Sequence, residues 1–124
     1  MMSGKVFYFH IRDEDEFGTR LPKGGHTVAI VRDAPLFYDL TSIPKILTLN
    51  IGITKVHPDD LYNKKIGREQ ASSKLQSVEV YLSSYHKSSN SFDHCEYSGV
   101  ANGIEFDIII KGSFIRHVAI GRIL

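Results

Sequence analysis

Apolar and polar residues alternate along several stretches of the chain, which is the pattern of strands that bury one face. The longest alternation covers residues 47–54, where leucine and isoleucine take turns with threonine, asparagine and glycine. The other predicted strands are residues 5–12, 26–32, 77–82, 103–110 and 113–124. In the first of these, Tyr8 and His10 share one predicted face, and Phe7 and Phe9 share the other.

A single main helix is predicted after the central strand. Pro58 suits a first helical position, and Asp59 and Asp60 can accept hydrogen bonds from the free N–H groups of a first turn. The helix is expected to run from about Pro58 to Gln76. Residues 77–82 then read as a strand, although continuation of the helix fits the apolar spacing there as well. These elements predict an α+β fold, an antiparallel sheet of five or six strands with one main helix packed on it.

Two cations lie on the helix face that is expected to meet the sheet. At about 100° per residue, Lys64 and Arg68 project into the same sector as Ala71 and Leu75, with Gly67 at its edge. Cations near the positive end of a helix and beside a glycine would suit a phosphate or a similar anion. The alternative is that both long side chains run along apolar surface to water, or pair with neighbouring acids.

The chain of 124 residues is predicted to form a single domain over residues 1–124, large enough to bury a core without disulfides. Residues 83–102 are mostly polar, begin with a serine-rich run and contain few large aliphatic residues, so they are predicted to be a mobile polar loop. Hydrophobic residues make up 42% of the chain and charged residues 23%, which favours a globular protein over a disordered or fibrous one.

Charge and the lengths of the apolar runs narrow the choice of partners. The formal charge of +1 argues against a binder of long nucleic acids, whose surfaces are usually strongly basic, but allows a local basic site. No apolar run is long enough to cross a bilayer, and the N-terminal residues do not resemble a secretory leader. A cytoplasmic protein without a membrane partner is therefore expected.

Six histidines raise the question of a metal site. None of them forms an H-x-x-x-H pair, and Cys95 is the only cysteine, which also rules out an internal disulfide. No metal and no other cofactor is expected, although a site assembled from His10, His26 and His117 on distant strands remains open. Cys95 follows His94 and could be a nucleophile, but its polar surroundings favour a passive thiol.

Several cations and aromatic rings together predict a binding site. Besides Lys64 and Arg68, the last predicted strand carries Arg116 and Arg122, and Tyr85 lies in the predicted polar loop. Cations neutralise phosphates and aromatic rings stack on bases, so these residues predict a ligand of nucleotide size.

The stretch from Pro58 to Ala71 has the pattern P-x-D-x-Y-x-K-K-x-G-R-x-x-A. This pattern resembles small phage-encoded proteins, and most of all the Thoeris anti-defence sponges. The resemblance implies a protein that sequesters a cyclic ADP-ribose signal unmodified and forms homo-oligomers with ligand pockets at subunit contacts. It also implies that Lys64, Lys65 and Arg68 bind the ligand.

The function predicted from the sequence is sequestration of a cyclic nucleotide or cyclic ADP-ribose-type immune signal by a phage counter-defence protein without catalytic residues. One alternative is a small phosphodiesterase that uses His57, His86 or His117 as acid and base. Another is an inhibitor that docks on a host protein through an exposed sheet edge or through the acidic residues 13–16. Turnover of the signal would support the first alternative, and a stable mixed complex would support the second.

Overall fold

Seven strands and one short helix make up the structure, a computed structural model that describes residues 5–32, 44–86, 94–111 and 114–120. The elements in chain order are β1 (Lys5–Ile11), β2 (Lys23–Arg32), β3 (Ile46–Leu61), α1 (Lys64–Ser73), β4 (Gln76–His86), β5 (His94–Ala101), β6 (Ile104–Lys111) and β7 (Phe114–Ile120). Each strand pairs antiparallel with the next one along the chain, in the order β1 to β7.

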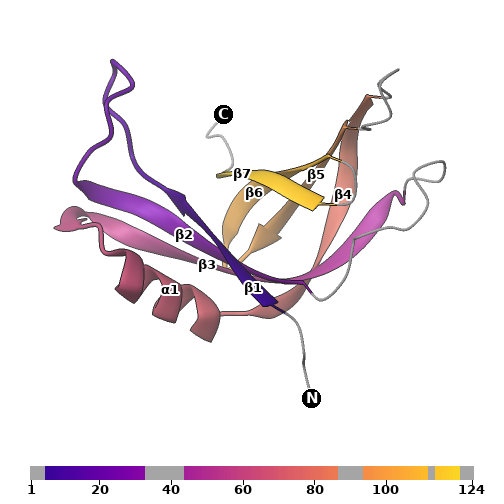
Figure 1. Cartoon of the computed structure of the whole chain (residues 1–124), viewed down its shortest axis with the longest axis horizontal. Coiled ribbons are helices and arrows are strands. Elements are labelled where there is room, and N and C mark those ends of the chain that lie inside the picture. The colour runs from indigo at the N-terminus through magenta and orange to yellow at the C-terminus, as the bar shows by residue number, and fades with distance from the viewer. Residues whose placement is uncertain (1–4, 33–43, 87–93, 112–113, 121–124) are drawn as a thin grey trace.

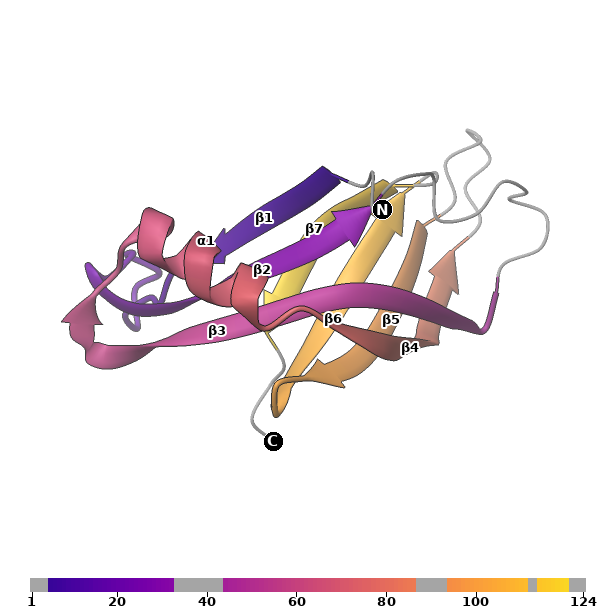
Figure 2. The same cartoon turned by 90° about the horizontal axis from the view of Figure 1, so that it is seen from below.

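The sheet curls into a nearly closed barrel (Figures 1 and 2). Its first and last strands, β1 and β7, lie next to one another, but no ladder joins them among the described residues. The predicted α+β fold of five or six strands with a main helix was therefore wrong. The chain forms more strands than expected, and its helix has only 10 residues.

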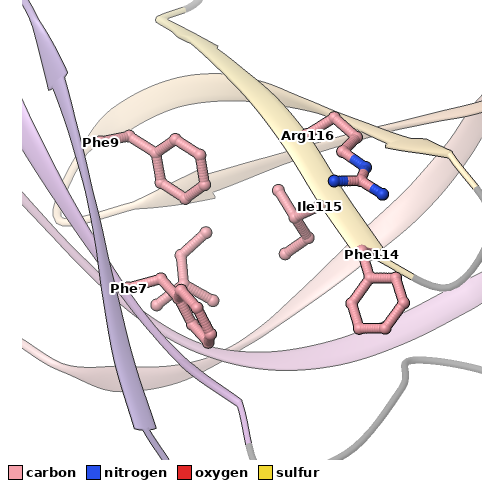
Figure 3. A pocket seen from close by; sticks show the side chains of 6 residues that line it. Phe7, Phe9, Phe114, Ile115 and Arg116 are labelled. Carbon is pink, nitrogen blue, oxygen red and sulfur yellow. The ribbon is translucent and has the colours of Figure 1, made fainter.

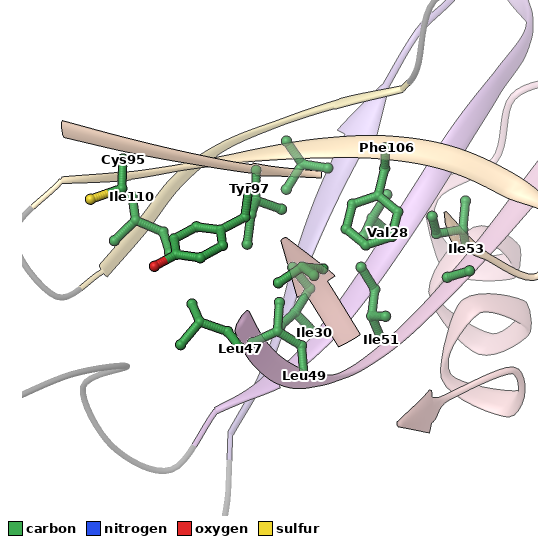
Figure 4. Packing of buried hydrophobic residues seen from close by; sticks show 14 residues of the cluster. Val28, Ile30, Leu47, Leu49, Ile51, Ile53, Cys95, Tyr97, Phe106 and Ile110 are labelled. Carbon is green, nitrogen blue, oxygen red and sulfur yellow. The ribbon is translucent and has the colours of Figure 1, made fainter. Parts of the chain in front are cut away.

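The core fills the inside of this barrel. Alternate residues of β2 to β7 point inward, which is why Tyr97 and Phe106 are almost completely buried beside branched aliphatic side chains (Figure 4). Burial of each such side chain stabilises the fold by about 1.5–3 kcal/mol. The Tyr97 hydroxyl donates a hydrogen bond of 2.5 Å to the Pro44 carbonyl, and burial raises the pKa of Tyr97 to about 12. Cys95 also lies in this core, in agreement with a passive thiol.

Helix α1 packs on the outside of the barrel, over β2 and β3. Asn63 caps it by accepting a hydrogen bond of 3.1 Å from the Ile66 N–H. Gly67 and Ala71 are its buried residues, and they lie against the outward positions Thr27 and Gly52. A helix this short is not stable alone, so this close packing holds it in place. Within the described part of the chain, no helix is long and apolar enough to cross a membrane.

The predicted start of the helix was wrong. Residues 58–61 continue β3, where Leu61 pairs with Lys23, and the helix begins only at Lys64. Among the described residues, the second half of β3 pairs with β2 and with no other strand, because β4 pairs with residues 46–51. Pro58 is tolerated in this half because proline, which lacks an N–H donor, fits strands that have one open edge.

The predicted polar loop at residues 83–102 was also wrong for most of its length. Residues 83–86 belong to β4 and residues 94–101 to β5. Most of their outward positions are polar, so the composition does not reveal the buried alternate positions such as Cys95 and Tyr97. Residues 77–82 are confirmed as a strand and not a continuation of the helix.

Candidate functional site

Strand β1 presents different chemistry on its two faces. Phe7 and Phe9 point into the barrel, where they lie near Ile30 of β2. Tyr8 and His10 point outward, as the alternation of residues 5–12 predicts. The Tyr8 hydroxyl lies 2.7 Å from the Ser72 hydroxyl, so the outer face of β1 contacts the last turn of α1.

The hydroxyl of Tyr62 holds His10 in place on this outer face. It lies 2.6 Å from Nδ1 of His10 and 3.0 Å from Oγ1 of the buried Thr27, and it donates to the His26 carbonyl at 3.3 Å. The rings of His10 and Tyr62 meet edge to face, with centroids 6.0 Å apart. Because Nδ1 is engaged, Nε2 is the nitrogen of His10 that can meet a ligand.

Arg12 lies on the other side of the same tyrosine. Its guanidinium stands 4.7 Å from the centroid of the Tyr62 ring, and its terminal NH2 donates to the Leu21 carbonyl at 2.8 Å. The Nε of Arg12 is buried and has no hydrogen-bond acceptor among the described residues. An oxygen of an anionic ligand could satisfy such a donor.

Lys64 and Arg68 of α1 act on His10 through space. The pKa of His10 is lowered from 6.5 first by burial, then by the positive charge of Lys64 and then by that of Arg68. This electrostatic effect requires both cations to lie near the imidazole. Lys64 is exposed and Arg68 is half-buried, so both can reach solvent or a ligand.

We call the cations Arg12, Lys64 and Arg68, together with the neighbouring His10, the cationic cluster. Within the described residues, the one ion pair joins His57 to Asp59, so no described carboxylate lies within ion-pair distance of the cluster. Cations that share a surface repel each other, and a bound anion relieves that repulsion. The arrangement suits a phosphate or a similar small anion, with Arg68 able to donate two hydrogen bonds at once.

The structure separates the residues that the sequence analysis assigned to one site. Lys64 and Arg68 lie together on α1, and Lys65 is exposed beside them. Tyr85 lies towards the far end of β4, about 30 Å of extended chain beyond the end of the helix. Arg116 of β7 lines a cavity on the inner side of the sheet. Arg122 lies outside the described residues.

The histidines proposed as an acid and base are not gathered in a pocket. His57 lies 3.7 Å from Asp59 on the second half of β3, and their side chains are 66% and 89% exposed. His117 is exposed on β7, while the side chain of His86 is not described. The described residues also contain no group of three histidine, cysteine, aspartate or glutamate side chains that could hold a metal ion.

Sequence reasoning missed His10 and Arg12 as members of the site. The alternation along β1 does place His10 on the same face as Tyr8, which is a usable signal. It does not show that this face meets α1, because the contact depends on where the helix lies over the sheet. Tyr62 was assigned to the helix but lies just before it, between β3 and the Asn63 cap.

A groove on another part of the sheet is lined by acidic residues, so its charge is opposite to that of the cationic cluster. This groove of about 900 Å³ lies over β4, β5 and β6, and its acidic lining residues are Glu79, Glu105 and Asp107. Two of these acids are held by neighbours, since Tyr81 donates to Glu79 at 3.0 Å and Ser98 donates to Asp107. This groove would repel an anion, which leaves the cationic cluster as the better site for one.

Comparisons with known proteins found no relative of this chain. No protein-family model, no curated protein and no solved structure matches the chain.

Proposed function

We propose that the protein binds a small phosphate-bearing molecule at the cationic cluster and holds it unaltered. The observation that carries this proposal is the joint effect of Lys64 and Arg68 on His10, in a cluster that no described carboxylate neutralises. A cyclic nucleotide or a cyclic ADP-ribose-type signal is the ligand class proposed, because its phosphates would match several cations at once.

Each member of the cluster has a role in this proposal. Arg68 donates two hydrogen bonds at once to phosphate oxygens, and Lys64 supplies a positive charge on a flexible side chain at the edge of the site. His10 contributes Nε2 while Tyr62 holds its Nδ1. The exposed Lys65 raises the local positive potential without direct contact.

Sequestration is favoured over cleavage by the arrangement of titratable groups. A phosphodiesterase that uses two histidines as base and acid needs both of them within hydrogen-bond reach of the same bound ligand. His10 has the Tyr62 hydroxyl as its partner, and the histidine–carboxylate pair of the described residues, His57 with Asp59, lies exposed on β3. A phosphodiesterase therefore has less support than a sponge.

The biological role follows from the resemblance of residues 58–71 to phage anti-defence sponges. We propose that the protein acts in the cytoplasm of an infected cell, removes a nucleotide immune signal, and works as a homo-oligomer. The curled sheet has open edges at β1 and β7 among the described residues, so docking on a host protein is a competing role for the same fold.

Uptake from a mixture tests the proposal. The purified protein is incubated with cyclic nucleotides and cyclic ADP-ribose isomers, freed of unbound ligand and heat-denatured, and the released compounds are identified by mass spectrometry. We expect one intact compound in near-stoichiometric amount, and its loss when Lys64 and Arg68 are both changed to glutamine. Lys45→Gln, an exposed lysine before β3, is the control. Release of a cleaved product would show an enzyme, and no uptake would refute the proposal.

A further inference from the structure

The gap between β1 and β7 contains a cavity that the proposed function does not use. Its volume is about 380 Å³, and its lining residues are Phe7, Phe9, Ile30, Phe114, Ile115 and Arg116. Phe7 and Phe9 point from β1 towards Ile115 of β7 across the gap (Figure 3). Phe7 is 44% exposed and Phe114 is 46% exposed, which are high values for phenylalanine. The cavity therefore presents apolar surface that remains accessible from outside.

A cation lies at the rim of this cavity, at an irregularity in β7. Ile110 pairs with Ile115 and Ile109 with His117, so Arg116 is the extra residue of a β-bulge. In a regular strand, Arg116 would alternate away from the face that Ile115 occupies. Phe114, Ile115 and Arg116 all line the cavity, so this end of β7 presents side chains from both of its faces to the gap, and Arg116 lies beside Phe114.

The charge of Arg116 is held beside the cavity. Its guanidinium lies 5.7 Å from the centroid of the Phe114 ring, within the range of a cation–π contact. Among the described residues, no carboxylate pairs with it, since the one ion pair is that of His57 and Asp59. An anion bound here would gain a charge-assisted hydrogen bond next to apolar surface.

We propose that this cavity binds a small organic carboxylate with an apolar body, which inserts between β1 and β7 while its carboxylate meets Arg116. If each non-hydrogen atom of the ligand takes up about 30 Å³, as a water molecule does in the liquid, the cavity has room for about a dozen of these atoms. Decanoate has about this size and charge. The site lies on the inner face of β1, whereas the cationic cluster lies on the outer face, so the two proposals stand or fall separately.

Calorimetric titration with decanoate and with decan-1-ol tests this proposal, because the two probes share a chain and differ in charge. The wild-type protein is expected to bind both. Arg116→Gln is expected to weaken decanoate binding by at least about tenfold and to leave decan-1-ol binding unchanged. Ile115→Trp, which fills the cavity, is expected to abolish binding of both probes. Arg20→Gln, in the loop between β1 and β2, is the charge control.

Three results would overturn the proposal: no decanoate binding by the wild type up to about 1 mM, equal decanoate binding by wild type and Arg116→Gln, or unchanged binding by Ile115→Trp. Circular dichroism of each variant shows whether it has kept the fold. If Ile115→Trp fails to fold, Phe9→Ala takes its place, and it is expected to weaken the binding of both probes because it removes a ring from the cavity wall.

Discussion

Replacing Gly52 with alanine is expected to lower the free energy of unfolding by about 3 kcal/mol, at the upper end of the usual cost of overpacking. A Cβ at this position would lie 2.1 Å from the Ala71 carbonyl oxygen and 2.9 Å from the Leu75 nitrogen. Both obstacles are backbone atoms, which cannot move aside by changing a rotamer. The helix would have to lift from β3, so the melting temperature should fall by about 10 °C.

Gly103→Ala is the matched control for this substitution. A Cβ at Gly103 meets no atom within 4 Å, but the residue has a φ of 76°, which disfavours a side chain. We expect a loss of about 1 kcal/mol from the backbone alone. Urea unfolding followed by circular dichroism measures both variants. A cost below about 0.5 kcal/mol for Gly52→Ala would mean that α1 does not pack as described.

Gly52→Ala also connects the packing of the helix to the function. Lys64 and Arg68 reach His10 only because α1 lies close against β2 and β3. Lifting the helix would move both cations away from β1. A folded Gly52→Ala protein should therefore bind the phosphate ligand more weakly, although residue 52 lies under the helix and outside the cationic cluster.

Arg68→Ala is expected to weaken the binding of cyclic ADP-ribose by about 2–3 kcal/mol, or roughly 30- to 150-fold in Kd. Arg68 is half-buried, so its charge is less screened by solvent than that of the exposed Lys64. Lys64→Ala should therefore cost less, about 1 kcal/mol. Calorimetric titration measures both variants.

The control for these two variants is Lys45→Ala, which removes an exposed charge before β3. It should bind as the wild type does, because Lys45 lies outside the helix and outside β1. If Arg68→Ala folds normally and retains wild-type affinity, the assignment of the site to the helix is wrong. If all three variants lose affinity equally, the effect comes from net charge and not from a specific site.

Much of the sheet could be predicted from the alternation along the chain. The strands at 5–12 and 77–82 appear near their predicted places, and Tyr8 and His10 do share a face. The end of β3 could not be predicted, because Pro58, followed by two acids, has the same local signature as a helix start. Only pairing of this segment with β2, a long-range contact, makes it a strand.

Strand β5 could not be predicted from the sequence for a different reason. Most of its outward residues are polar, with Val100 as the apolar exception, so the segment has the composition of a loop. The two fully buried residues Cys95 and Tyr97 alternate with them, but two positions form too short a pattern to outweigh the composition. Pairing with β4 on one side and β6 on the other explains why the segment is extended.

The candidate site was partly predictable because Lys64 and Arg68 are one helical turn apart. Their neighbours in the fold, His10 and Arg12, are more than fifty positions away in the sequence, and no local pattern links them. Arg116 was expected to join them, but it lies on β7 and lines the cavity on the inner side of the sheet. The charge of a residue does not show on which face of the sheet its side chain lies.

The most direct test of the central claim is the pKa of His10, followed through its ring resonances by NMR with and without cyclic ADP-ribose. Burial first, and then the positive charges of Lys64 and Arg68, lower this pKa in the free protein. A bound diphosphate would offset those charges and favour the protonated ring, so the pKa should rise on binding. The complex then takes up a proton, and the affinity should increase as the pH falls through the pKa of His10 in the complex.

Changing Lys64 and Arg68 together to glutamine provides the control within the same experiment. The free protein should then show a higher pKa for His10 than the wild type, and the ligand should no longer change it. These results together would establish that the two helix cations and His10 form one anion site. A His10 pKa that is the same in wild type and in the double variant, and that does not move with the ligand, would contradict the account.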